Sequence, residues 1–257
     1  MNARNDDNEF FRGLRVAVTG GTSGLGLALV ERLHAAGAHV AFVARGADRV
    51  EAVAHRLPGT HGIVGDIADK QATHPIALQV NALLGGLDVL VHNASTLGPQ
   101  ALAPLADTEC EDLEAALATN LVGPFRLTKA LLGALAASAR EGRPALVVLI
   151  SSDAAVNAYA TWGAYGASKA ALAHLGRIWD EELRGLGVRV IDHDPGDMDT
   201  PLHAQAVPDA DRAALKRPEL AASELLARVI ATVGRGPQDP DARIESSGSR
   251  ATPTYAA

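Results

Sequence analysis

The fold of this chain is constrained most strongly by a regular alternation of short apolar runs with longer helical patterns. The apolar runs lie at residues 15–19, 39–43, 61–65, 88–92, 145–151 and 188–193. The helical patterns lie at residues 24–36, 47–56, 69–84, 109–139 and 163–185. Strands that alternate with helices form βαβ units with right-handed crossovers, which make a parallel sheet with both faces covered. We therefore predict an α/β fold, a doubly wound parallel sheet of the Rossmann type with helices on both faces.

Length and composition agree with one domain of this kind. The chain has 257 residues, of which 47% are hydrophobic and 21% charged, enough for a single sizeable core. We predict one domain over residues 1–257, with a polar N-terminal extension at 1–12 and a polar tail at 234–257 that needs no fixed structure.

Charge and cysteine content exclude several classes of function. A net charge of -7 without a basic cluster argues against nucleic acid and anionic membranes as partners. The single cysteine, Cys110, cannot form an internal disulfide, and residues 1–12 lack the pattern of a secretory signal. The most apolar run, residues 145–150, is too short to cross a bilayer. We expect a cytoplasmic protein.

A glycine-rich turn follows the first apolar run and leads directly into a helical pattern. It reads Thr19-Gly-Gly-Thr-Ser-Gly-Leu-Gly26. A strand, a glycine turn and a helix N-terminus together form an anion site, because the backbone approaches closely and unpaired amides face the charge. No Lys-Ser/Thr pair follows, which excludes a Walker-type loop, and a turn that only closes a strand is the alternative. The candidate contacts of this turn with a phosphate-bearing ligand are Gly20, Thr22, Ser23, Gly24, Leu25 and Gly26.

Three other residues point to proton transfer. Tyr165 and Lys169 are four residues apart and share a helix face, and Ser152 lies thirteen residues before the tyrosine. A phenol has a pKa of about 10, and a neighbouring positive charge favours its phenolate. The Y-x-x-x-K pattern by itself also arises by chance on amphipathic helices.

In this order and at these separations, the glycine turn, Asn93-Ala94, Asn120, Ser152 and the Tyr165/Lys169 pair resemble the classical short-chain dehydrogenase/reductase family. The resemblance covers roughly residues 14 to 200. It implies an NAD(P)-dependent oxidoreductase that transfers a hydride between nicotinamide and the carbonyl or alcohol of a small molecule. Tyr165 would be the general acid/base, Ser152 would bind the substrate oxygen, and Lys169 would lower the pKa of the tyrosine and bind the nicotinamide ribose. Asn120 would hold a water that links Lys169 to solvent.

The resemblance also implies contacts with the rest of the cofactor. Asp66 would contact the adenine, although an aspartate here could equally cap the next helix. In the P-G-x-x-x-T segment after the last apolar run, Thr200 would hold the nicotinamide carboxamide. The further cofactor-binding residues on this pattern are Ile67, Asn93, Ala94, Tyr165, Lys169, Pro195 and Gly196.

The end of the second apolar run bears on the choice of cofactor. A carboxylate there would bind the adenosine ribose of NAD, whereas an arginine pairs with the 2′-phosphate of NADP. This chain has Ala44 followed by Arg45, so we predict NADP(H) in preference to NAD(H). The alternative is that Arg45 only ends a strand and faces water.

Several segments depart from the family pattern or remain open. His92 and Ser95 replace an asparagine and a glycine, and we expect His92 to be packed or hydrogen-bonded. The nine histidines show no metal-ligand spacing, so no metal is assigned. Residues 242–245 leave it open whether a seventh strand forms.

The substrate cannot be named from the sequence, but two segments should shape its pocket. Tyr159, Thr161 and Trp162 would form an aromatic, weakly polar wall, or could equally be core. Residues 202–218 would cover the substrate as a lid.

Other functions and an assembly state follow from the same resemblance. A dinucleotide-binding regulator or scaffold with little turnover, or an isomerase or dehydratase, could use the same fold. The alanine-rich patterns at 109–139 and 163–185 correspond to helices that pair in family dimers and tetramers. We expect a homodimer or homotetramer.

Overall fold

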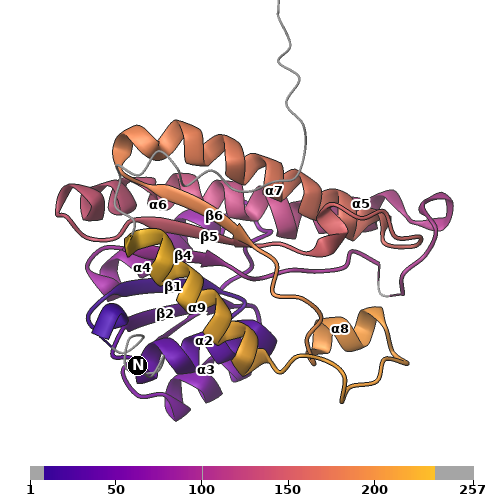
Figure 1. Cartoon of the computed structure of the whole chain (residues 1–257), viewed down its shortest axis with the longest axis horizontal. Coiled ribbons are helices and arrows are strands. Elements are labelled where there is room, and N and C mark those ends of the chain that lie inside the picture. Colours follow the sequence, from indigo (N-terminus) through magenta and orange to yellow (C-terminus); the bar gives the residue numbers. More distant parts are fainter. Residues whose placement is uncertain (1–8, 100, 235–257) are drawn as a thin grey trace, which may run out of the picture.

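The computed structural model describes residues 9–99 and 101–234, which are arranged around one parallel sheet of six strands (Figure 1). The strand order is β3-β2-β1-β4-β5-β6, so the order reverses between β1 and β4. The strands are β1 Arg15–Thr19, β2 His39–Ala44, β3 His61–Val64, β4 Val89–His92, β5 Leu146–Ile150 and β6 Arg189–His193. All six predicted strands are present, and the doubly wound sheet is confirmed.

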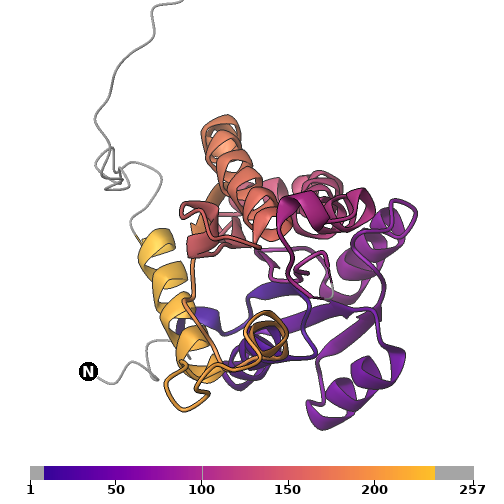
Figure 2. The ribbon, with the colours of Figure 1, turned by 90° about the vertical axis from the view of Figure 1, so that its right-hand side faces the viewer.

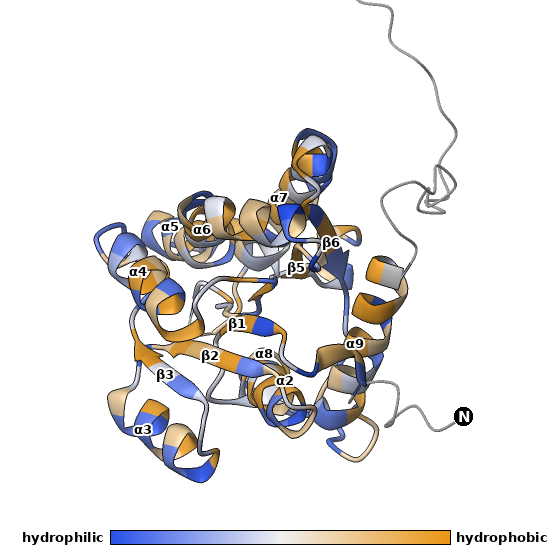
Figure 3. Ribbon diagram, turned by 90° about the vertical axis from the view of Figure 1, so that its left-hand side faces the viewer, coloured by the Kyte–Doolittle hydropathy of each residue, from blue (hydrophilic) through white to orange (hydrophobic). Residues whose placement is uncertain are grey.

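Helices cover both faces of this sheet, as Figure 3 shows along the strands. One face carries α2 Gly24–Ala35, α3 Ala47–Arg56 and α9 Pro218–Gly234, and the other carries α4 Thr73–Leu84, α6 Gly123–Arg140 and α7 Gly163–Leu183. The shorter helices are α5 Cys110–Leu117 and α8 Pro201–Ala206. Single 3₁₀ turns lie at Leu105–Asp107, Asp153–Ala155 and Arg184–Leu186.

The core has two apolar layers because successive residues of a strand point to opposite faces. Val16 and Val18 of β1 face the layer under α2 and α9, whereas Ala17 faces the layer under α4 and α6. In Figure 3 most of β1 and β2 has the hydrophobic colour, with hydrophilic residues on the outer sides of α3 and α4. A strand covered on both sides must be apolar throughout, which explains the uninterrupted apolar runs of the sequence.

A buried carboxylate joins the strands at the end of the sheet opposite the glycine turn. The Asp88 side chain has no exposed surface and accepts hydrogen bonds from Arg15 Nη2 at 2.7 Å and Arg143 Nη2 at 2.6 Å. Burial alone would raise the pKa of Asp88, but the bonds from Arg143 and Arg15 outweigh it and hold the pKa far below its usual value. Asp88 therefore stays ionised and fastens β1 to the start of β4.

Three features of the fold differ from the expectations. The pattern at 109–139 is not one helix, because a π-helical turn at Ala118–Val122 separates α5 from α6. Helix α9 was not expected, although its buried residues Leu225, Leu226 and Val229 follow helical spacing. In the predicted N-terminal extension, Phe11 is buried in the core.

The possible seventh strand at 242–245 lies outside the described residues. Within residues 9–99 and 101–234, no helix is both long and apolar enough to cross a membrane.

Candidate active site

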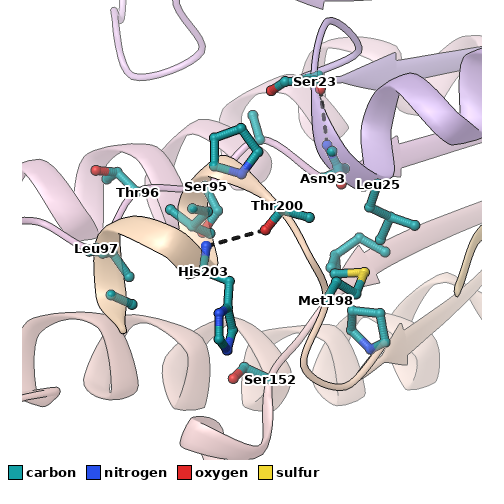
Figure 4. A pocket seen from close by; sticks show the side chains of 18 of the residues that line it. Ser23, Leu25, Asn93, Ser95, Thr96, Leu97, Ser152, Met198, Thr200 and His203 are labelled. Carbon is teal, nitrogen blue, oxygen red and sulfur yellow. Dashed lines mark hydrogen bonds between the residues drawn. The ribbon is translucent and has the colours of Figure 1, made fainter. Parts of the chain in front are cut away.

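A pocket of about 650 Å³ lies at the carboxyl ends of the strands, where strand order reverses. Figure 2 views the molecule from this side, with α8 nearer to the viewer than α2. In Figure 4 the glycine turn with Ser23 and the segment with Ser152 lie at opposite ends of the view, with Thr200 and His203 between them. The pocket is lined by residues from all six strand ends. Every predicted site residue lines it except Gly26 and Asn120.

The glycine turn is shaped so that a ligand can approach its backbone. Gly20 and Gly24 have φ of +71° and +51°, which side-chain-bearing residues rarely adopt. A Cβ on Gly20 would lie 2.9 Å from the Cα of Ala94, and one on Gly24 would lie 3.1 Å from the Thr200 methyl group. The cradle and the N-terminus of α2 therefore fit a pyrophosphate.

Gly26 packs against the glycine turn on the side away from the pocket. It does not line the pocket, and a Cβ there would collide with the carbonyl oxygen of Gly20 and the side-chain amide of Asn93. That amide donates to the carbonyl oxygens of Thr19 at 2.9 Å and Gly20 at 3.2 Å. The structure thus places Gly26 as a packing residue, and Asn93 holds β4 to the turn.

The end of the pocket beside β2 and β3 is positively charged. Arg45 and Arg49 both line it, both are exposed, and neither has an ion-pair partner among the described residues. Arg49, in the first turn of α3 and four residues after Arg45, was not among the predicted site residues. Asp66 lines the same end, and its Oδ1 accepts from the amide of Ala68 at 2.9 Å within a local turn. It does not cap the next helix, because α4 begins at Thr73 with Ala72 as its N-cap.

Ser152, Tyr165 and Lys169 meet at the opposite end of the pocket. Tyr165 and Lys169 are buried, and the Lys169 Nζ lies 5.5 Å from the centroid of the tyrosine ring. Lys169 Nζ donates to the backbone oxygen of Ile150 at 2.7 Å, which fixes it between α7 and β5. The structure therefore brings together the three residues that the spacing predicted.

The electrostatics of this pair differ from the expectation. Burial raises the pKa of Tyr165 to about 12, and the neighbouring Ser152 side chain acts in the opposite direction. Burial also lowers the pKa of Lys169 to about 8, and the charge of Asp194 acts in the opposite direction. Burial penalises the charged form of both groups, so the lysine does not by itself bring the phenol into a working range. At neutral pH the phenol is protonated, which suits an acid.

The side chain of Asn120 does not have the free hydrogen-bonding groups expected of a residue that holds a water. Its buried side chain donates to the Thr96 carbonyl oxygen and Ser168 Oγ, both at 2.8 Å. Its Oδ1 accepts from Ser95 Oγ and the Thr96 amide. Both N–H groups are already used, so a part in the relay would have to come through the backbone of the π-helical turn.

The segment after β6 forms a lid over the pocket. Thr200 Oγ1 accepts from the amide of His203 at 3.2 Å and so caps α8 (Figure 4). Lys216 Nζ donates to the carbonyl oxygen of Pro195 at 3.0 Å, and Arg212 forms an ion pair with Asp199. Within the predicted lid, the residues that line the pocket are Leu202, His203, Ala206, Val207, Ala210 and Leu215.

The wall predicted from residues near the tyrosine is present in part. Tyr159 and Trp162 line the pocket, whereas Thr161 does not and has an unusual φ of 72°. Asp153, which was not among the predicted site residues, also lines the pocket and directly follows Ser152. His92 lies in the core, where its Nε2 is 2.8 Å from Thr128 Oγ1. In the described part of the chain, no group of three histidine, cysteine or acidic residues could hold a metal.

Comparison with known proteins gives consistent results. A model of the short chain dehydrogenase family matches residues 15–211. The chain is 34% identical over 187 residues to serine 3-dehydrogenase of Agrobacterium fabrum, covering 72% of each protein. It spans between 59% and 78% of the length of the curated relatives that it matches.

Solved structures of short chain dehydrogenases have the same fold. One from Pseudomonas syringae superposes with a TM-score of 0.79 at 30% identity, covering 86% of this chain and 91% of the other. An alcohol dehydrogenase of Thermococcus sibiricus complexed with 5-hydroxy-NADP superposes with a TM-score of 0.73 at 26% identity, covering 84% and 90%.

Proposed function

The chain belongs to the short chain dehydrogenase family of oxidoreductases, and we propose that it reduces a small-molecule carbonyl, or oxidises the corresponding alcohol, with a preference for NADP(H). One observation carries this proposal. The side chains of Ser152, Tyr165 and Lys169 line the same pocket as the glycine cradle, at its other end. With a dinucleotide bound on the glycine cradle, the Tyr165 hydroxyl would therefore lie beside the nicotinamide ring.

In this proposal a bound nicotinamide dinucleotide supplies the hydride or accepts it. Tyr165 gives a proton to the carbonyl oxygen of the substrate, or takes one from the alcohol. Ser152 Oγ donates a hydrogen bond to the same oxygen and stabilises the negative charge that develops there. Lys169 stabilises the phenolate that remains when Tyr165 has lost its proton. Thr200 would bind the carboxamide of the cofactor, because its hydroxyl hydrogen remains available while Oγ1 accepts from His203.

The preference for NADP(H) rests on the charge of the adenosine end. Arg45 and Arg49 are exposed there without an acidic partner among the described residues, so a 2′-phosphate would find two cations. The solved relative from Thermococcus sibiricus is complexed with 5-hydroxy-NADP, in line with this preference.

Replacing Arg45 by alanine should therefore weaken NADPH binding about tenfold to a hundredfold, the loss expected for one charge-assisted contact. NADH, which lacks the phosphate, should bind almost as before. Fluorescence titration of the two reduced cofactors measures both dissociation constants without turnover. Arg56→Ala is the matched control, because Arg56 is exposed, pairs with Glu31 and does not line the pocket. Equal weakening of both cofactors by Arg45→Ala would remove the assignment.

The pH dependence of the reduction follows from Lys169. Its pKa of about 8 means that its charge is lost as the pH rises through that value, while Tyr165, with a pKa of about 12, keeps its proton. We expect kcat/KM for carbonyl reduction to be level near pH 7 and to fall above about pH 8. Lys169→Arg should move this fall to higher pH, because arginine stays charged. A wild-type profile that is level up to pH 10 would contradict the proposed role of the lysine.

The experiment that tests the function is a spectrophotometric screen of NADPH and NADH oxidation with aldehydes, ketones and 3-oxoacyl thioesters. Net consumption of NADPH with any member supports an oxidoreductase. Tight cofactor binding without consumption across the panel would favour the alternative of a regulator or scaffold. Product formation without net consumption would favour an isomerase or dehydratase.

We also propose that the single domain acts in the cytoplasm as a homodimer or homotetramer. The support is the family membership together with the small residues along α6 and α7, which allow close helix packing. Sedimentation as a monomer at micromolar concentration would rule out both assemblies.

A further inference from the structure

The hydroxyl of Ser152 is engaged within the protein. Its Oγ donates to Asp153 Oδ1 at 3.2 Å and accepts from the amide of Ala154 at 3.2 Å. A serine hydroxyl has a single hydrogen to donate. While that hydrogen points to Asp153, Ser152 cannot donate it to the oxygen of a substrate.

Asp153 is held in place and is not neutralised. Its other oxygen, Oδ2, accepts a 2.6 Å hydrogen bond from the hydroxyl of Tyr159. The carboxylate is exposed and lines the pocket, and no cationic side chain of the described residues forms an ion pair with it. A fixed negative charge therefore lies directly beside the serine that is proposed to bind the reacting oxygen.

Tyr159, which bonds to this carboxylate, belongs to a row of aromatic rings in the pocket wall. The ring of Trp162 meets those of Tyr159 and Tyr165 edge to face, with centroid distances of 6.3 Å and 5.8 Å, and all three line the pocket. Aromatic faces and a carboxylate together recognise an organic cation. Lys169, a cation in the same part of the pocket, donates to the carbonyl oxygen of Ile150. An anionic group would meet only repulsion from Asp153.

We infer that the substrate carries an ammonium group on the carbon next to the reacting carbon, as in a vicinal amino ketone or amino alcohol, and that Asp153 selects it. This inference rests on the proposed function of the site. The adjacent position follows because Ser152 Oγ has to contact the substrate oxygen and already contacts Asp153. An ammonium group that donates to Asp153 replaces the hydrogen bond from Ser152. The Ser152 hydroxyl then rotates and donates its hydrogen to the substrate oxygen. Recognition of the cation and activation of the oxygen are thus coupled.

The test compares two ketones of similar size, aminoacetone and hydroxyacetone, as substrates with NADPH at pH 7. The wild-type enzyme should have at least a tenfold higher kcat/KM for aminoacetone. Asp153→Asn should lower the ratio of the two kcat/KM values at least tenfold. Asp197→Asn is the matched control, since Asp197 also lines the pocket and loses the same charge, but lies outside the network of Ser152. In the Asp197→Asn enzyme the ratio of the kcat/KM values for the two ketones should change less than threefold. An unchanged ratio in Asp153→Asn, or equal changes in both variants, would overturn the inference.

A binding measurement separates this inference from the proposed function. The chain has two tryptophans, so Trp179→Phe leaves Trp162 as a single fluorescent reporter in the aromatic wall. Trp179 stacks on Phe125, and a phenylalanine keeps that aromatic contact. In this background with NADP⁺, 1-amino-2-propanol should change the Trp162 emission with saturation, and 1,2-propanediol should not. Asp153→Asn should abolish the difference.

The two results can then be read independently. Neither ketone being reduced, with the amine still bound through Asp153, would count against the proposed oxidoreductase while the ligand class stands. Equal responses to the amine and the diol would overturn the ligand class whether or not the ketones are reduced.

Discussion

Replacing Tyr165 by phenylalanine should lower kcat for carbonyl reduction by about two to four orders of magnitude, the contribution expected of a positioned general acid. The substitution removes one oxygen and leaves the ring. That ring is 7% exposed and packs edge to face on Trp162 at 5.8 Å, so the pocket should keep its shape. The affinity for NADPH should therefore stay within about threefold, because the glycine cradle lies at the other end of the pocket.

Steady-state kinetics and a fluorescence titration of NADPH measure the two quantities on the same preparation. Tyr159→Phe is the comparison variant, since it removes a hydroxyl from the exposed rim of the same pocket. Its kcat should fall far less than that of Tyr165→Phe. A Tyr165→Phe enzyme with wild-type turnover would remove Tyr165 from the chemistry.

The second large effect concerns stability. Asp88→Asn should lower the free energy of unfolding by about 3 kcal/mol, at the lower end of the range for breaking a buried ion pair, because Arg143 is partly exposed. The substitution leaves the guanidinium groups of Arg15 and Arg143 without their carboxylate. For a chain of this size the loss corresponds to a melting temperature lower by roughly 6 to 12 °C. Urea denaturation at pH 7 measures the free energy directly.

The pH dependence of this difference gives a second test. The pKa of Asp88 is depressed in the folded protein, so its contribution is present above the unfolded pKa of about 3.9 and is lost as the pH falls toward the folded value. The gap between wild type and Asp88→Asn should be constant above about pH 5 and should shrink below about pH 4.

Glu181→Gln is the matched control for this charge loss. Glu181 is exposed and pairs with Arg184 on the surface of α7, so its loss should cost less than about 1 kcal/mol. Equal losses of unfolding free energy in Asp88→Asn and Glu181→Gln would show that burial does not increase the contribution of Asp88 to stability.

The fold could be predicted well because its signal is local and repeated. Each β-strand covered on both faces has to be apolar along its length, so residues 145–151 and the other runs were recognisable without any tertiary contact. The helices were predicted less well. The π-helical turn at Ala118–Val122 left no trace in the sequence pattern. The helix at Pro218–Gly234 was not predicted, although its apolar residues follow helical spacing.

The candidate site could be predicted as a set of residue types but not as a set of contacts. Spacing identified Ser152, Tyr165 and Lys169, and the structure places all three in one pocket. The partners of Asn120 come from the segment after β4 and from α7, so its saturated amide could not be foreseen. Asp153 was missed because an acidic residue after a serine has no motif of its own.

The sequence by itself determined the positions of the six strands along the chain, the glycine turn and the chemical groups available for proton transfer, because each depends on neighbours within a few residues. Only the tertiary structure decided how those groups behave. Burial raises the pKa of Tyr165 and lowers that of Lys169. Gly26 packs against the glycine turn outside the pocket, and Asp153 accepts the hydrogen bond that Ser152 donates. Burial depends on what the rest of the chain packs against each group, and no local pattern contains that information.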